Sequence, residues 1–183
     1  MTTLAENDNY VKEHVRIVPN FPKEGIMFLD ITTAVKDAKA MQMMTNFLYE
    51  HFKNEKVDYV AGIESRGFIF GAALAYKLGC GFITVRKPNK LPAKTIREDY
   101  TLEYGTNTIE IHEDALSKGD RVVVIDDLLA TGGTAIAACN LIKRVGAEVV
   151  STAFIIELNP LKGREKIEKN GYKVLSMLNY DLD

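Results

Sequence analysis

Short apolar segments alternate with longer amphipathic ones through most of the chain. The short segments are rich in β-branched residues and span residues 57–63, 82–86, 121–125, 149–156 and 172–178. Runs such as VVVI at 122–125 lack the polar alternation of a half-exposed strand, which indicates strands covered on both faces. The pattern therefore predicts five strands of one parallel sheet.

Amphipathic or apolar segments of helical length separate these strands. They span residues 38–53, 68–78, 134–145 and 161–169. Gly79 and Gly146 follow two of them as expected left-handed helix ends, and Pro160 can open the last. The alternation predicts an α/β fold with an open parallel sheet flanked by helices. Residues 1–28 and 87–116 show no such pattern and are predicted to be long irregular stretches.

Length and composition bound the organisation. With 183 residues, 46% of them hydrophobic and 26% charged, the chain is expected to form one globular domain over residues 1–183. Within it, residues 1–33 form an N-terminal arm and flap, and residues 87–116 form a separate surface region. The two cysteines, Cys80 and Cys139, fit neither a disulfide framework nor a zinc site, so both thiols are expected to be reduced.

Charge and hydropathy argue against several partners. The formal net charge is −2, so no global positive field would attract a nucleic acid or an anionic membrane. The first residues are acidic, unlike a secretory signal. The longest nearly uncharged stretch, residues 67–76, is about half the length that spans a bilayer. A cytoplasmic protein is expected, without nucleic-acid or membrane partners.

The most informative segment is VVVIDDLLATGGT at residues 122–134. A buried strand ends at Asp126 and Asp127, and a loop of small residues then leads into a helix. Backbone N–H groups at a helix start suit a phosphate, and the two acids suit sugar hydroxyls. Neither GxxxxGK[ST] nor GxGxxG is present, so other nucleotide-binding loops fit less well. The alternative is that the acids cap the helix and the glycines form a turn.

This string resembles the phosphoribosyl pyrophosphate motif of the type I phosphoribosyltransferases. In that family the acids hold the ribose 2′ and 3′ hydroxyls, and the following loop wraps the 5′-phosphate. The resemblance implies binding roles for Asp126, Asp127, Ala130, Thr131, Gly132, Gly133 and Thr134. It extends from about residue 17 to residue 178.

Two further strand ends carry candidate pyrophosphate ligands. VAGIESRG at 60–67 resembles the family's pyrophosphate loop, and FITVRKPNK at 82–90 clusters cations after a strand. Arg66 offers a planar fork of donors to a leaving pyrophosphate. The candidate pyrophosphate-binding set is Glu64, Ser65, Arg66, Gly67, Arg86, Lys87 and Lys90. The alternative for both segments is a solvated, charged turn.

Residues 90–111 are long for a connector and mix polar with aromatic side chains, which is typical of a lid. A lid would keep water from an oxocarbenium-like ribosyl centre; the alternative is a mobile surface hairpin. YTLEYG at 100–105 resembles a signature of the family's adenine branch. The resemblance gives Glu103 proton transfer at the purine, and Tyr104 could orient the base or the pyrophosphate.

PNFPKEGIMFLDITT at residues 19–33 also resembles the adenine branch, in which a flap binds the base. Phe28 would stack on adenine, while the Met27 C=O and the Leu29 N–H would face its amino group and ring nitrogen. Many relatives carry arginine where Leu29 stands, which leaves the geometry at this position open.

The resemblance implies that adenine displaces pyrophosphate from 5-phosphoribosyl-1-pyrophosphate (PRPP), with Arg66, Lys87 and Glu103 as catalytic residues. Mg²⁺ is expected with the substrate's pyrophosphate and diol rather than in a protein cage, with Asp126 or Asp127 contacting it through water. A homodimer is expected, and whether Lys87 or Lys90 serves the neighbouring site stays open. The alternatives are another base, such as hypoxanthine, guanine, xanthine or orotate, and a non-catalytic PRPP-binding regulator.

Overall fold

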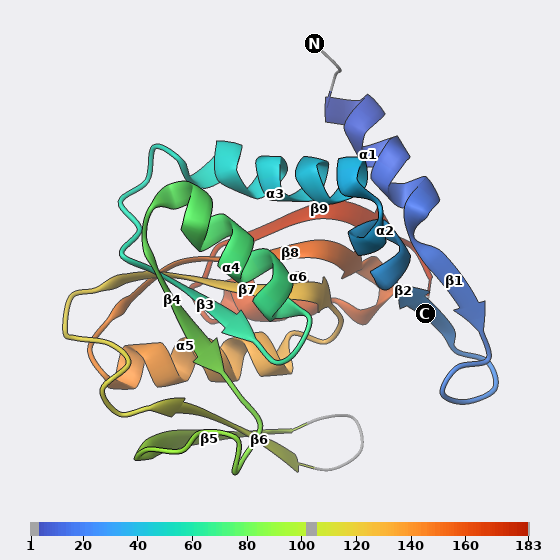
Figure 1. Ribbon diagram of the computed structural model, residues 1–183. Coiled ribbons are helices and arrows are strands. Elements are labelled where there is room, and N and C mark those ends of the chain that lie inside the picture. The colour runs from blue at the N-terminus through green and yellow to red at the C-terminus, as the bar shows by residue number, and fades with distance from the viewer. Residues whose placement is uncertain (1–3, 102–105, 183) are drawn as a thin grey trace.

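The computed structural model describes residues 4–101 and 106–182, and its centre is a five-stranded parallel sheet (Figure 1). The strand order is β4-β3-β7-β8-β9. The strands are β3 (Tyr59–Ile63), β4 (Gly81–Val85), β7 (Arg121–Leu129), β8 (Glu148–Leu158) and β9 (Val174–Tyr180). All five predicted strands are confirmed, with β7 and β8 longer at their carboxyl ends than the apolar pattern indicated.

Helices cover both faces of this sheet (Figure 1). They are α1 (Leu4–His14), α2 (Thr32–Lys36), α3 (Ala38–Phe52), α4 (Gly67–Leu78), α5 (Gly133–Arg144) and α6 (Gly163–Lys169). The α/β fold class is confirmed. Along β7, Val123 and Ile125 pack in the core of α3 and α4, whereas Val122 and Val124 pack against α5. This alternation explains why the strand has no polar face.

Local capping sets several helix ends. The Asp37 carboxylate accepts a hydrogen bond from the Ala40 N–H at 2.7 Å and starts α3. Gly79 ends α4 with φ of 68°, and Gly146 follows α5 with φ of 84°, as predicted. Pro160 does not open the last helix: it lies in a 3₁₀ turn (Asn159–Leu161), and α6 begins at Gly163.

The prediction of irregular structure over residues 1–28 and 87–116 is wrong. The first stretch holds α1 and a hairpin of β1 (Arg16–Pro19) with β2 (Met27–Asp30). The second holds an antiparallel hairpin of β5 (Thr95–Thr101) and β6 (Thr106–His112). The β5 and β6 strands are rich in polar residues and carry little of the apolar signal on which strand prediction relies. The β1 and β2 strands are apolar, but each has only four residues. Nowhere in the described ranges does a helix combine the length and apolar character that a membrane crossing requires.

Packing of α4 against the sheet provides a test of the core. Phe70 is fully buried, whereas Tyr76 on the same helix is 88% exposed. We expect Phe70→Ala to lower the free energy of unfolding by about 3–5 kcal/mol, because a large buried side chain is lost and a cavity is left. Tyr76→Ala should change it by less than about 0.5 kcal/mol. Urea denaturation measures both, and equal effects would contradict the assigned packing.

Candidate active site

The strand order creates one point where chain connections diverge. β3 pairs with β4 on one side and with β7 on the other. The carboxyl ends of β3 and β7 therefore lie side by side, at the place where ligands bind in open α/β sheets. Residues 64–67 follow β3 and are here called the pyrophosphate loop after their predicted ligand. Asp126 and Asp127 lie in the last part of β7, where the sequence predicted the strand to end. Residues 130–134 follow β7 and are here called the phosphate loop after their predicted ligand.

Close backbone packing holds these segments together. A Cβ at Gly67 would lie 2.6 Å from the carbonyl oxygen of Ile125 and 3.1 Å from the Cα of Asp126. Only a residue without a side chain allows the start of α4 to approach the end of β7 this closely. The candidate residues of the two segments are therefore neighbours in space, as the motifs predicted.

A cavity of about 260 Å³ opens between them. It is lined by Glu64, Ser65, Arg66, Lys87, Asp126 and Asp127. The Arg66 Nε donates a hydrogen bond to the carboxylate of Asp127, which is only 4% exposed. The structure thus brings six of the predicted ligands to one cavity, which both cationic and acidic side chains line.

Glu64 faces its neighbours rather than the cavity alone. Its carboxylate accepts hydrogen bonds from the Arg86 Nε and the Lys87 backbone N–H, both at 3.1 Å. Burial opposes ionisation, but these hydrogen bonds hold the pKa of Glu64 below its ordinary value. The charged Glu64 joins the pyrophosphate loop to residues 86–90, here called the cation loop. Lys90 is exposed, and its carbonyl accepts a hydrogen bond from Arg86 at 3.1 Å.

The phosphate loop lines a second hollow, of about 120 Å³. All five loop residues line it: Ala130, Thr131, Gly132, Gly133 and Thr134. Helix α5 begins at Gly133, and its N-cap, Gly132, makes no side-chain cap hydrogen bond. The first N–H groups of α5 therefore carry the partial positive charge that suits a phosphate. Asp126 lines both hollows, so it lies at the boundary between them.

The flap is the β1–β2 hairpin, in which Pro19 pairs with Met27 and Val18 pairs with Phe28. Pro19 has no N–H, so its pair cannot exchange backbone hydrogen bonds. Because hydrogen-bonded and non-hydrogen-bonded pairs alternate in an antiparallel ladder, Val18 and Phe28 form the hydrogen-bonded pair. Met27 and Leu29 consequently turn their N–H and C=O groups away from β1, as base recognition by these groups requires.

Side chains of the flap divide between core and surface. Phe28 is half-buried and meets Phe21 edge to face, with 5.0 Å between ring centroids. Leu29 is 4% exposed and packs in the main core with Val11 and Ile31. The side chain at position 29 is therefore a core residue here, whereas the backbone of the same residue lies at the edge of β2.

The stem of the lid region is anchored to the rest of the molecule. On α5, Asn140 donates to the Glu98 carboxylate at 3.0 Å, and Arg144 donates to it at 2.8 Å. On the other side, Arg86 and Glu110 exchange backbone hydrogen bonds. Sequence reasoning missed these anchors, since Asn140 and Arg144 lie outside any motif and Arg86, a predicted ligand, is linked to Glu110 through its backbone. The predicted residues Glu103 and Tyr104 lie outside the described residues.

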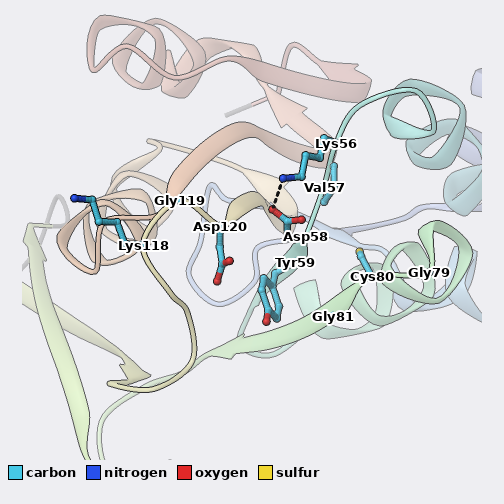
Figure 2. Close-up of a pocket in the computed structure, with 10 residues that line it drawn as sticks. All are labelled: Lys56, Val57, Asp58, Tyr59, Gly79, Cys80, Gly81, Lys118, Gly119 and Asp120. Carbon is cyan, nitrogen blue, oxygen red and sulfur yellow. Dashed lines mark ion pairs between the residues drawn. The ribbon is translucent and has the colours of Figure 1, made fainter.

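A larger hollow, of about 620 Å³, lies at the opposite edge of the sheet (Figure 2). It is lined by residues at the amino ends of strands, including Tyr59 and Gly81, and holds an ion pair between Lys56 and Asp58 at 3.9 Å. It contains neither a helix N-terminus nor paired acids facing an arginine. The smaller cavities are therefore the better candidates for the active site, because their lining residues suit phosphate groups and a sugar. Among the residues described, no group of three or more His, Cys, Asp or Glu side chains could hold a metal ion.

Comparison with known proteins agrees with this geometry. A family model of the phosphoribosyl transferase domain matches residues 32–181. The adenine phosphoribosyltransferase of Koribacter versatilis (strain Ellin345) is 52% identical over 180 residues, 98% of this chain and 98% of the relative. The chain therefore belongs to the phosphoribosyltransferase family. Its whole-length similarity within that family is to the adenine phosphoribosyltransferases.

Solved structures give the same result. The adenine phosphoribosyltransferase of Thermoanaerobacter pseudethanolicus is 48% identical with a TM-score of 0.91, covering 94% of this chain and 99% of that one. The enzyme from Saccharomyces cerevisiae, complexed with an imino-altritol bisphosphate and adenine, is 38% identical with a TM-score of 0.88, covering 95% and 99%. The family model starts at residue 32, so only the whole-length relatives include the flap.

The two adjacent acids, Asp126 and Asp127, lower the stability of the folded protein. Burial, together with the Asp127 carboxylate, raises the pKa of Asp126 well above its ordinary value of 3.8. Folded Asp126 binds its proton more tightly than unfolded Asp126. Stability therefore falls as pH rises from about 3.8 through the raised folded pKa.

We expect Asp126→Asn to raise the melting temperature of the ligand-free protein at neutral pH, because it removes a charge that the fold disfavours. The gain should shrink to nothing near pH 3, where the carboxyl is protonated in both states. Thermal denaturation across this pH range measures it. The exposed Asp114→Asn is the control and should show no such trend. A lower melting temperature for Asp126→Asn at neutral pH would contradict the electrostatic argument.

Proposed function

We propose that the protein joins adenine to PRPP, forming AMP and pyrophosphate in purine salvage. The observation that carries the proposal is the pair of hollows that share Asp126. One offers helix N–H groups to a 5′-phosphate, and the other offers Arg66 and Lys87 to a pyrophosphate. A ribose between them would lie beside the two acids, in the order in which these groups occur in PRPP.

The sugar and its phosphate are assigned to one set of residues. Asp126 and Asp127 accept hydrogen bonds from the ribose hydroxyls, and the phosphate loop, residues 130–134, binds the 5′-phosphate. Asp127 accepts a hydrogen bond from Arg66, and in this assignment the ribose takes Asp127 while the pyrophosphate takes Arg66. Such an exchange keeps the buried Asp127 carboxylate hydrogen-bonded.

The leaving group is assigned to the opposite wall. Ser65, Gly67, Arg86, Lys87 and Lys90 complete the pyrophosphate site around Arg66. Charge builds up on the pyrophosphate as its bond to the anomeric carbon breaks, so fixed cations stabilise the transition state more than the bound substrate. Glu64 belongs to this set as the residue that holds the cation loop in place.

The base is assigned to the flap. Phe28 stacks on adenine, the Met27 C=O accepts from its amino group, and the Leu29 N–H donates to its ring nitrogen. In the reaction, N9 of adenine forms a bond to the anomeric carbon, and the carbon–oxygen bond to pyrophosphate breaks with its electron pair leaving on oxygen. Glu103 takes the proton lost from the imidazole ring, and Tyr104 orients the base.

Mg²⁺ fits the donors of this site, since Asp126 and Asp127 offer carboxylate oxygens next to the proposed diol and pyrophosphate positions. When bound with PRPP, it would supply charge neutralisation at the pyrophosphate. The two carboxylates would hold it through water.

We also propose a cytoplasmic homodimer. Cys80 and Cys139 are free thiols, which fits a reducing compartment. Large apolar side chains of the flap, Ile17, Phe21 and Ile26, are 40–50% exposed, which fits coverage by a second copy.

Incubation of the protein with Mg²⁺, PRPP and each purine in turn tests the function. AMP and pyrophosphate should form with adenine, and hypoxanthine should be used at least about 10⁴-fold less efficiently, because fixed peptide groups would face like groups on its edge. Equal use of hypoxanthine would favour a different base specificity. PRPP binding without pyrophosphate release from any base would indicate a regulator.

Backbone reading of adenine has a specific test at the flap. Leu29 and Met27 both occupy non-hydrogen-bonded positions of the hairpin, so proline at either removes an N–H without breaking a β1–β2 hydrogen bond. Only the Leu29 N–H is assigned to the base. We expect Leu29→Pro to raise the KM for adenine about tenfold or more, as expected for a lost buried hydrogen bond, and Met27→Pro to leave it within about twofold. Circular dichroism checks folding. Equal adenine KM values for the two folded variants would contradict the assignment.

A further inference from the structure

Helix α6 lies directly behind the phosphate loop. A Cβ at Gly163 would lie 2.2 Å from the carbonyl oxygen of Ala130, and a Cβ at Gly132 would lie 2.9 Å from the carbonyl oxygen of Gly163. Two glycines thus let two backbone segments touch. Ile167 of the same helix packs with Leu129 beneath the loop. The loop therefore takes its shape against α6 as well as against its own chain.

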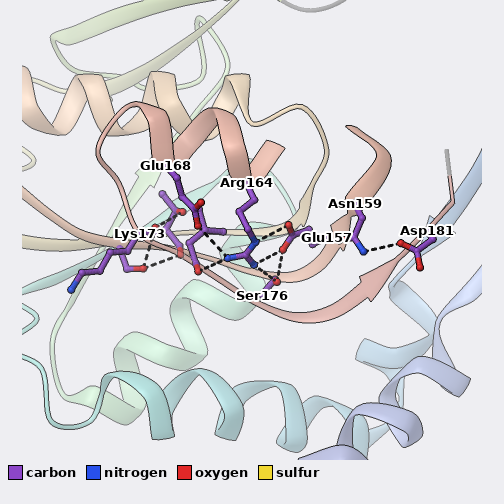
Figure 3. Close-up of polar contacts among 10 residues, drawn as sticks. Glu157, Asn159, Arg164, Glu168, Lys173, Ser176 and Asp181 are labelled. Carbon is purple, nitrogen blue, oxygen red and sulfur yellow. Dashed lines mark hydrogen bonds and ion pairs between the residues drawn. The ribbon is translucent and has the colours of Figure 1, made fainter. Parts of the chain in front are cut away.

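One arginine fixes α6 to the sheet (Figure 3). Arg164 donates from Nε and Nη2 to the two carboxylate oxygens of Glu157, at 2.9 and 2.5 Å. It also donates to the Val174 carbonyl at 2.9 Å and to the Ser176 Oγ at 2.8 Å. Ser176 in turn donates to Glu157 at 2.5 Å. These contacts join α6 to both β8 and β9.

Because Glu157 is buried, its contact with Arg164 tolerates little change. Glu157 is 4% exposed, so removing its partner would leave a buried, unpaired carboxylate. A lysine could not reproduce the two parallel bonds of the guanidinium. Since Arg164 follows Gly163 directly, the link sets the position of the residue that touches the phosphate loop.

We infer that Gly163 and Arg164 are positioning residues for the 5′-phosphate: α6, held by Arg164, is the support against which the phosphate loop presents its N–H groups. This inference rests on the proposed function, because it assigns a support to the proposed phosphate site. Neither residue needs to contact a substrate. A shifted loop would bind the 5′-phosphate less well, while the base and pyrophosphate sites on the flap and cation loop stay in place.

Gly163→Ala tests the inference, since its methyl group requires the Ala130 carbonyl to move. We expect the KM for PRPP to rise about tenfold or more, the loss of roughly one charge-assisted hydrogen bond. AMP affinity should fall by a similar factor. The KM for adenine, the affinity for pyrophosphate and kcat at saturating PRPP should stay within about twofold.

Gly81→Ala is the matched control. Its Cβ would lie 2.5 Å from the Tyr59 ring at the other edge of the sheet, so it strains the fold without touching the phosphate loop. It should lower the melting temperature and leave the KM for PRPP unchanged. If Gly163→Ala does not fold, Arg164→Lys tests the inference instead, and the same changes in the KM for PRPP and in AMP affinity are expected.

Unchanged PRPP and AMP binding in the folded variant, or equal losses for adenine and pyrophosphate, would overturn the inference. These outcomes differ from failure of the proposed function, in which the wild-type protein itself would make no AMP from PRPP and adenine.

Discussion

The contact between the carboxyl ends of β3 and β7 is the constraint on which the site depends. Gly67 packs against the carbonyl of Ile125, so the start of α4 and the end of β7 share one surface. Arg66 and Asp127 lie on either side of that contact and meet in a hydrogen bond. Glu64, at the same strand end, extends the arrangement to the cation loop. Three segments from distant parts of the chain are thereby fixed relative to one backbone junction.

That junction concentrates charge in a small, partly buried volume. Asp126 and Asp127 are adjacent, and the raised pKa of Asp126 records their mutual repulsion and burial. Arg66 and Arg86 pair with Asp127 and Glu64, so most of the charge is compensated internally. An anionic substrate can bind such a site by exchanging partners rather than by stripping water from free charges. The pair of acids lowers the stability of the fold, which is common where function sets residue choice.

The apolar pattern predicted the parallel sheet because its strands are buried on both faces, and β7 shows the reason in Val122 to Ile125. The candidate ligands on β3, β4 and β7 were predictable because parallel strands present their carboxyl ends at one edge. The β5–β6 hairpin was not predictable in this way, since Glu98 is held to α5 by polar contacts with Asn140 and Arg144 rather than by an apolar face. Support from α6 was equally hidden, because a contact between Gly163 and Ala130 depends on tertiary structure and leaves no pattern in the sequence.

The β5–β6 stem is anchored to the rest of the molecule at two places. Helix α5 begins at the phosphate loop and, further along, holds Glu98 through Asn140 and Arg144. The cation loop holds the other strand through the backbone pairing of Arg86 and Glu110. The stem is therefore tied both to the helix that follows the phosphate loop and to the cation loop. Because β5 ends at Thr101, two residues before Glu103, the point from which the chain continues to the proposed proton acceptor is fixed by both.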